Sequence, residues 1–203
     1  MKQPVEYDGI DWETYEEISE QVSESSRMHV NYYKGTLTIM PLSELHEILA
    51  NLLDKFVTFA SIYLQVNVVP TGGATRRSKS KLIGVEPDLS YFVSSASIHR
   101  IKNYIENEVR LPPDIVVEID LWNRSDKKFA AYSELGVSEF WRYLDGKLQI
   151  FLLQNDGKYA EIERSGQLPI LTSQILTDYL NRGEEEELFL ILTDFQNWLQ
   201  SNK

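Results

Sequence analysis

One segment of the chain has a clear helical spacing of apolar residues. Between residues 43 and 63 the apolar side chains recur three or four positions apart, at Leu45, Ile48, Leu49, Leu52, Leu53 and Phe56. Ser43, just after Pro41, is a suitable N-cap. The pattern therefore predicts a helix from Ser43 to about Tyr63. Before it, residues 30–40 alternate apolar and polar positions around Lys34-Gly35, which predicts a β-hairpin.

Other segments have strand patterns. Residues 66–69 predict a short strand, and residues 85–93 predict a strand with a proline near its start. Residues 112–121 are rich in β-branched side chains and follow two prolines, which predicts a central strand. Residues 138–162 predict a β-meander, since Asp-Gly pairs mark its two turns.

The remaining patterns predict helices over residues 11–24, 125–135, 172–181 and 185–200. Gly136 is placed to end the second of these. Residues 94–110 give no clear pattern. Strands that alternate with helices in this order predict a mixed β-sheet flanked by helices, an α/β or α+β fold with a β-meander after its core.

The length of 203 residues fits one domain with extensions. We expect an acidic helical extension over residues 1–27, a core over 28–165, and C-terminal helices over 166–203 that pack on the core. The chain has no cysteine, which excludes disulfides, thiolate metal sites and a cysteine nucleophile. No apolar run is long enough for a membrane span, and the N-terminus lacks the apolar stretch of a secretory signal, so we expect a cytosolic protein.

The net charge of -11 argues against a simple electrostatic grip on nucleic acid. The acids are concentrated in residues 1–26 and 184–187, so the rest of the chain is neutral overall. Within that neutral part lies a basic loop, made of Arg76, Arg77, Lys79 and Lys81. The loop is a candidate to contact phosphates, and equally a solvated surface loop.

Two predicted strands carry acids among apolar residues. On 85–93, Glu86, Asp88 and Ser90 are expected to share one face; on 112–121, Glu118 shares a face with Val116. A buried acid is costly unless it is paired, hydrogen-bonded or metal-bound. Carboxylates on neighbouring strands can bind Mg²⁺ or Mn²⁺, which can activate water against a phosphate.

A plain structural explanation stays open beside the metal site. Asp88 can be a turn residue after Pro87, and Glu118 can form an ion pair with Lys128 on the next helix. His29 and His99 have no companions that suggest ligation. Lys127 is expected to be solvated.

One set of residues, spread over both acid-bearing strands and the helix that follows, resembles a known family. Pro87-Asp88, then Val117-Glu118-Ile119, and then Lys128, Tyr132, Gly136-Val137 and Glu139-Phe140-Trp141 at their spacing resemble the Uma2 family, with Met40-Pro41 and His46-Glu47 upstream. The resemblance spans roughly residues 28–153. That family is similar in fold to PD-(D/E)XK restriction endonucleases, and the resemblance implies a restriction-endonuclease-like core and metal-dependent cleavage of DNA.

Carried over by position, the resemblance makes Asp88 and Glu118 the metal ligands. The usual lysine two residues after the glutamate is replaced by Asp120, and the resemblance implies that Lys128 supplies the ammonium group instead. Asn31 stands where many relatives carry an acid. His46 is expected either to face the site or to cap its helix, whereas Glu47 lies opposite the apolar stripe and is expected in solvent.

We therefore expect a Mg²⁺- or Mn²⁺-dependent DNA endonuclease with Asp88, Glu118, Lys128 and His46 in its site. A homodimer is expected, because cutting two strands requires two sites. Two alternatives stay open: a non-catalytic binding or assembly module that keeps the fold, and a metal-dependent hydrolase of a small phosphate ester.

Overall fold

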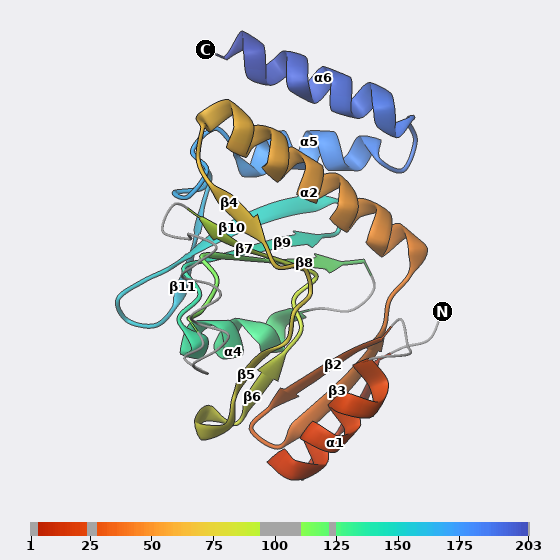
Figure 1. The fold of residues 1–203 in the computed structure, drawn as a ribbon, viewed down its shortest axis with the longest axis vertical. Coiled ribbons are helices and arrows are strands. Elements are labelled where there is room, and N and C mark those ends of the chain that lie inside the picture. The colour runs from red at the N-terminus through yellow and green to blue at the C-terminus, as the bar shows by residue number, and fades with distance from the viewer. Residues whose placement is uncertain (1–3, 24–27, 94–110, 122–124, 203) are drawn as a thin grey trace.

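The computed structural model describes residues 4–23, 28–93, 111–121 and 125–202, which form two open β-sheets with helices around them (Figure 1). The larger sheet has six strands in the order β11-β10-β9-β8-β7-β4. Its strands are β4 (Val68–Pro70), β7 (Leu89–Val93), β8 (Ile115–Asp120), β9 (Glu139–Leu144), β10 (Lys147–Leu153) and β11 (Tyr159–Ile162). Only the β8–β9 pairing in this sheet is parallel. The predicted mixed sheet with a β-meander is confirmed.

The smaller sheet has five strands in the order β1-β3-β2-β6-β5. They are β1 (Val5–Tyr7), β2 (Met28–Tyr33), β3 (Thr36–Pro41), β5 (Arg76–Ser78) and β6 (Ile83–Val85). The hairpin β2–β3 turns at Lys34-Gly35 as predicted, and both residues have positive φ. Strand β1 was not predicted, because its side chains are exposed and it is held by backbone pairing with β3.

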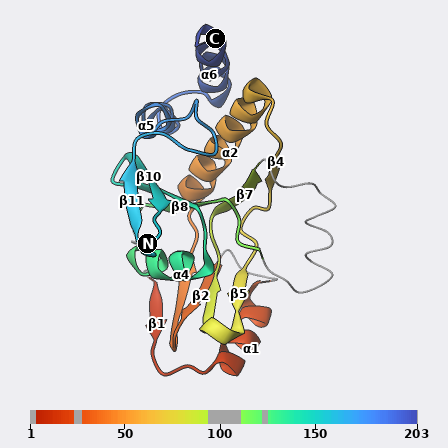
Figure 2. The same ribbon diagram turned by 90° about the vertical axis from the view of Figure 1, so that its left-hand side faces the viewer.

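Three helices gather on one side of the larger sheet: α2 (Glu44–Leu64) and α5 (Ser173–Arg182) lie against the sheet, and α6 (Leu188–Ser201) packs on these two helices. Ser43 caps α2 by accepting a hydrogen bond from the His46 N–H, as predicted. The predicted apolar stripe of α2 packs against β7, β8 and β9 in the main core, except for Ile48, whose side chain is 49% exposed. Figure 2 shows these helices gathered at one end of the molecule.

The opposite face of the larger sheet carries α4 (Lys128–Leu135), which follows the short 3₁₀ turn η2 (Ser125–Lys127). Val116 and Phe140 pack there against Tyr132, and Gly136 ends the helix with a φ of 83°. The predicted alternation of β8 is confirmed, since Val117 and Ile119 face the other core.

Helix α1 (Trp12–Ser23) packs on β2 of the smaller sheet. Two large aromatic side chains anchor this helix: Trp12 and Tyr15 are buried, Tyr15 stacks on Tyr32, and Trp12 meets the Tyr32 ring edge-on. The division of the chain at residues 27 and 165 stays a prediction.

The prediction of one continuous strand over residues 85–93 is wrong. β6 ends at Val85 in the smaller sheet, and β7 begins at Leu89 in the larger one. Pro87 has no N–H to donate to a ladder, and the chain crosses between the sheets at residues 86–88. Asp88 therefore stands where the two sheets meet.

The predicted basic loop is also partly regular structure. Residues 76–78 form β5, in which Arg77 pairs with Gly84, and Lys79–Lys81 form the 3₁₀ turn η1. The segment 94–110 lies outside the described residues. Among the described residues, none of the helices has the length and apolar composition needed to cross a lipid bilayer. Across the part of the chain that the structure describes, the arrangement of two sheets and five α-helices is that of a restriction-endonuclease-like α/β fold.

Candidate functional site

The carboxylate of Asp88 is fixed at the crossing between the two sheets. Its backbone N–H donates to the Val117 carbonyl over 3.0 Å, and its Oδ2 accepts a 2.5 Å hydrogen bond from the Ile119 N–H. Only 2% of the side chain is exposed. These two bonds hold Asp88 beside β8, because their partners Val117 and Ile119 are the residues directly before and after Glu118.

Two histidines flank the Asp88 carboxylate. His46 Nε2, at the start of α2, lies 2.9 Å from Oδ2, and His29 Nδ1, on β2, lies 3.4 Å from Oδ1. The expectation that His29 has no companion is wrong, because β2 meets the crossing only in the folded chain. The ring of His46 faces the site, which was one of the two expectations for this residue. Its backbone N–H donates to the hydroxyl of Ser43, the residue that caps α2. Glu47 is exposed, as the helical wheel predicted.

Glu118 lies on β8 with both carboxylate oxygens hydrogen-bonded. Lys128 Nζ donates to Oε2 over 2.7 Å, and the Tyr132 hydroxyl donates to Oε1 over 2.5 Å. Lys128 also donates to the Glu86 carbonyl over 3.0 Å. All three side chains are buried, so helix α4 presents a fixed ammonium and a fixed hydroxyl to one carboxylate.

Burial and the neighbouring charges set the protonation of this cluster. Burial raises the pKa of Glu118 to about 8, even though the Lys128 ammonium opposes the change. Burial lowers the pKa of Lys128, but the carboxylates of Glu118 and Asp88 outweigh it, so the pKa of Lys128 lies above its usual value.

The pKa values of the two histidines are shifted in opposite directions. Burial lowers the pKa of His29 to about 4. Burial also acts to lower the pKa of His46, yet its contact with Asp88 outweighs burial and raises that pKa. In turn burial acts to raise the pKa of Asp88, and its contact with His46 prevails and lowers it. Asp88 therefore carries a negative charge close to the proton of His46.

Asp120 occupies the position of the motif lysine and has a different contact. One of its oxygens accepts from both the N–H and the hydroxyl of Ser125, each over 2.7 Å. These bonds tie the end of β8 to the turn that begins α4, and so help to place Lys128. The acid-to-serine spacing of five residues was the only signal of this link in the sequence.

Asn31 and Glu86 tie β2 of the smaller sheet to the segment that follows β6, next to the site. The Glu86 N–H donates to Asn31 Oδ1 over 2.9 Å, and Glu86 Oε2 accepts from the Val30 N–H over 2.9 Å. Glu86 Oε1 accepts from the Thr75 hydroxyl over 3.0 Å. Asn31 thus serves as a structural tie in this chain.

A small pocket of about 150 Å³ reaches this cluster. We call it the lysine pocket, since Lys128, Asp120 and Asn31 lie in its wall together with Lys127 and Tyr33. Lys127 is exposed, as predicted, and pairs with Glu6 over 2.6 Å. Asp88 and Glu118 do not line this pocket, so Lys128 is the group of the cluster that borders it.

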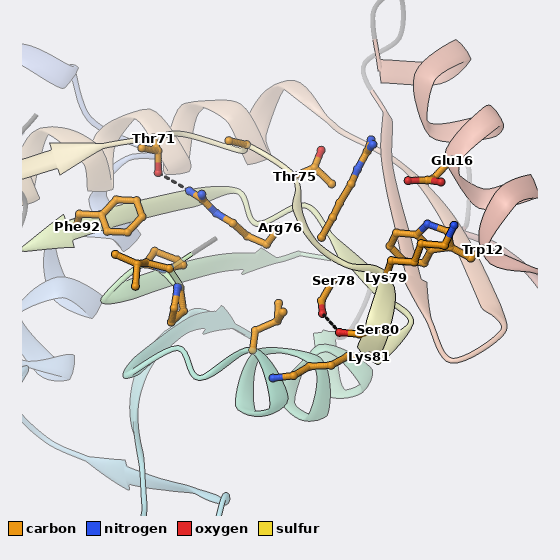
Figure 3. A pocket seen from close by; sticks show the side chains of 16 residues that line it. Trp12, Glu16, Thr71, Thr75, Arg76, Ser78, Lys79, Ser80, Lys81 and Phe92 are labelled. Carbon is orange, nitrogen blue, oxygen red and sulfur yellow. Dashed lines mark hydrogen bonds between the residues drawn. The ribbon is translucent and has the colours of Figure 1, made fainter. Parts of the chain in front are cut away.

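A larger groove of about 930 Å³ lies along β5 and η1, and contains the four predicted phosphate-contacting residues (Figure 3). We call it the basic groove. Arg76 donates to the Thr71 and Ser90 hydroxyls over 2.5 and 2.8 Å and lies over the Phe92 ring. Arg77 donates to the Ser19 hydroxyl over 2.7 Å and lies over the Tyr15 ring.

The two lysines of the basic groove have weaker attachments. Lys79 pairs with Glu13 over 3.0 Å at an exposed position, and Lys81 donates to the Glu134 carbonyl. Exposed ion pairs contribute little to stability, so these ammonium groups can exchange partners at small cost. Trp12 and Glu16 lie in the same groove, which is therefore of mixed charge (Figure 3).

The donor set suits a hard divalent cation that keeps several waters. Within the described ranges no cluster of three or more His, Cys, Asp or Glu side chains forms a ready-made metal site. Mg²⁺ needs fewer protein ligands, commonly one or two carboxylates with water. Asp88 Oδ1 is buried without a hydrogen-bond partner, which leaves a free oxygen for an ion. Glu118 can contribute an oxygen once Lys128 or Tyr132 releases it.

The comparison with known proteins agrees with the fold. A model of the Uma2 family, described as "putative restriction endonuclease", matches residues 12–181. The match includes both sheets except β1, and every residue of the cluster around Asp88 and Glu118. No curated protein matches the chain.

Proposed function

Since the chain belongs to the Uma2 family, we propose that it is a metal-dependent endonuclease that hydrolyses phosphodiester bonds in DNA. Asp88 and Glu118 hold the Mg²⁺ or Mn²⁺ ion, Lys128 supplies the positive charge, and His46 orients Asp88. The observation that carries the proposal is the contact of a buried carboxylate on β8 with a buried ammonium on α4, next to a second buried carboxylate at the sheet crossing.

A bound divalent ion supplies Lewis acidity and lowers the pKa of a bound water. The chain's own groups do the rest. His46 fixes one oxygen of Asp88 and leaves Oδ1 directed elsewhere. Lys128, at the wall of the lysine pocket, places a charge where a phosphate oxygen can approach. Asp120 fixes the turn that carries Lys128, in place of the lysine of the usual motif.

We predict that Asp88→Asn and Lys128→Met each reduce cleavage about a hundredfold or more, because each removes a charge that the reaction needs. The assay is nicking of supercoiled plasmid and cutting of linear duplex with Mg²⁺ or Mn²⁺. Lys127→Met is the matched control for Lys128, since it removes the adjacent but exposed lysine. Asp88→Asn cutting as fast as the parent, with the same ion dependence, would falsify the mechanism.

We also propose that the basic groove binds the DNA backbone. Replacing both Lys79 and Lys81 with alanine is expected to weaken duplex binding and to reduce the slope of log affinity against log salt by about 1 to 2. The measurement is fluorescence anisotropy with a labelled duplex over a series of salt concentrations. Lys147→Ala removes an exposed lysine outside the groove and serves as control. An unchanged slope would mean that DNA lies elsewhere.

A non-catalytic binding module that keeps the fold is the second candidate. The observation that favours it is the saturation of Glu118, whose two oxygens both accept hydrogen bonds inside the protein. This candidate predicts that the parent binds no divalent ion and cuts no DNA. We further propose a homodimer for the active nuclease, which sedimentation equilibrium would test.

A further inference from the structure

Two buried polar atoms face each other beside Asp88 without hydrogen bonds. They are Asp88 Oδ1 and His29 Nδ1, which lie 3.4 Å apart. Buried polar atoms in proteins are nearly always hydrogen-bonded, so such a pair calls for an explanation. His29 lies on β2 of the smaller sheet and Asp88 directly precedes β7 of the larger one, so the fold brings them together at the crossing.

A proton on His29 does not explain the contact. An N–H on Nδ1 would donate to the carboxylate, yet the pair does not meet hydrogen-bond geometry. We assign the ring proton to Nε2, which leaves two atoms that each carry a lone pair only 3.4 Å apart, with no proton between them. A cation between the two atoms turns this repulsion into attraction.

The spacing fits two ligands of one ion. Metal bonds of about 2.1 Å to a nitrogen and an oxygen place neighbouring ligands about 3.0 to 3.4 Å apart, for angles between a right angle and a tetrahedral one. The observed separation of 3.4 Å lies at the upper end of that range. Asp88 Oδ2 is engaged by the Ile119 N–H and lies near His46, so the free oxygen cannot turn away from His29.

We propose that Asp88 Oδ1 and His29 Nδ1 together bind one divalent transition-metal ion, so that the site prefers Mn²⁺ or Co²⁺ over Mg²⁺. Imidazole nitrogen suits transition metals, whereas Mg²⁺ favours oxygen ligands. The inference rests on the proposed function, in which Asp88 is a metal ligand, and adds a nitrogen ligand from β2. Water fills the remaining positions, and Glu118 adds an oxygen once Lys128 or Tyr132 releases it.

The surroundings of His29 allow this role. A side chain at Gly73 would place its Cβ 3.0 Å from the Pro87 carbonyl and 3.8 Å from His29 Nε2. The turn at residues 71–73 thus comes close to the outer edge of the ring, and Nδ1 stays on the side of Asp88. The ion would connect the two sheets, so metal should raise the melting temperature as a ligand of the folded state does.

The decisive test is pulsed electron paramagnetic resonance of Mn²⁺ bound to a His46→Gln/His99→Gln chain. The protein has three histidines, so His29 is the only one left in this variant. We expect a nitrogen coupling typical of a directly bound imidazole. Its absence in a folded, Mn²⁺-binding sample would overturn the inference, and so would the absence of Mn²⁺ binding by the parent chain.

Calorimetric titration of Mg²⁺, Mn²⁺ and Co²⁺ gives the second readout. His29→Phe keeps a ring of similar size without nitrogen, and should lower Mn²⁺ and Co²⁺ affinity about tenfold or more while changing Mg²⁺ affinity little. Equal losses for all three ions would contradict a nitrogen ligand. If His29→Phe does not fold, the resonance experiment still decides, because it keeps His29.

The outcomes separate this inference from the proposed function. Loss of Mn²⁺ binding in Glu118→Gln but not in His29→Phe would remove His29 from the site and leave the nuclease proposal standing. A nitrogen coupling from His29 in a chain that cuts no DNA would support the metal site and refute the nuclease.

Discussion

The stability of the Glu118→Gln variant, measured relative to the parent at the same pH, is expected to increase as the pH rises. Glu118 has a pKa of about 8 in the folded protein, against an ordinary value of 4.5. Between these values the folded state keeps a proton that the unfolded chain releases, so the parent loses stability as the pH rises from about 4.5 to 8. Glutamine carries no such proton.

The size of this effect follows from the shift in pKa. The free energy of unfolding of Glu118→Gln minus that of the parent should increase by about 3 kcal/mol between pH 5 and pH 7.5. Glu118 is mostly protonated in the folded parent over this range, so the exchange of a carboxyl for an amide beside Lys128 shifts the difference by a constant amount and leaves its slope unchanged, as long as Lys128 stays charged. The slope is therefore the quantity to compare.

Urea unfolding at several pH values in the presence of a chelator measures this difference without interference from metal. Glu47→Gln, which removes an exposed carboxylate from α2, is the matched control. A difference that stays constant from pH 5 to pH 7.5 would show that Lys128 and Tyr132 fully offset the burial of Glu118. Glu118 and Lys128 would then form an ordinary buried ion pair, which is the alternative to a metal site that the sequence left open.

Features of the fold that depend on neighbouring residues were predictable from the sequence. The apolar stripe from Leu45 to Phe56 and the N-cap at Ser43 define α2, and the Lys34-Gly35 turn defines the hairpin. Their signals lie within a few residues of each other. The alternation on β8 likewise predicted that Glu118 faces the α4 side, because the side chains of a strand alternate.

Features that depend on distant partners were not predictable in this way. Residues 85–93 read as one strand, since nothing local shows that β6 pairs with β2 and β7 with β8. The contact of His29 with Asp88 depends on that change of sheet, and so it was missed. The link from Asp120 to Ser125 was missed for another reason: any acid near a serine gives the same weak signal.

The close packing of Gly84 against Tyr15 leads to the largest effect expected on folding outside the site. Gly84 lies in β6 between β2 and β5, where it pairs with Tyr32 and Arg77. A Cβ at this position would lie 2.0 Å from the Tyr15 hydroxyl oxygen and 2.2 Å from the ring carbon that carries it. Tyr15 is fully buried and stacks on Tyr32 at 4.8 Å, so its ring cannot move aside freely.

We therefore expect Gly84→Ala to lower the free energy of unfolding by about 3 kcal/mol or more, the upper range for overpacking a core. Tyr15→Ala supplies the matched comparison, because it removes the ring and costs about 3 to 5 kcal/mol for the cavity alone. In the double variant the new methyl group occupies part of that cavity. The double variant should therefore lose clearly less free energy of unfolding than the sum of the losses in the two single variants. Additive losses in urea unfolding would mean that the ring of Tyr15 does not restrict position 84. In that case α1 would be less firmly packed on the smaller sheet than its buried aromatic residues indicate.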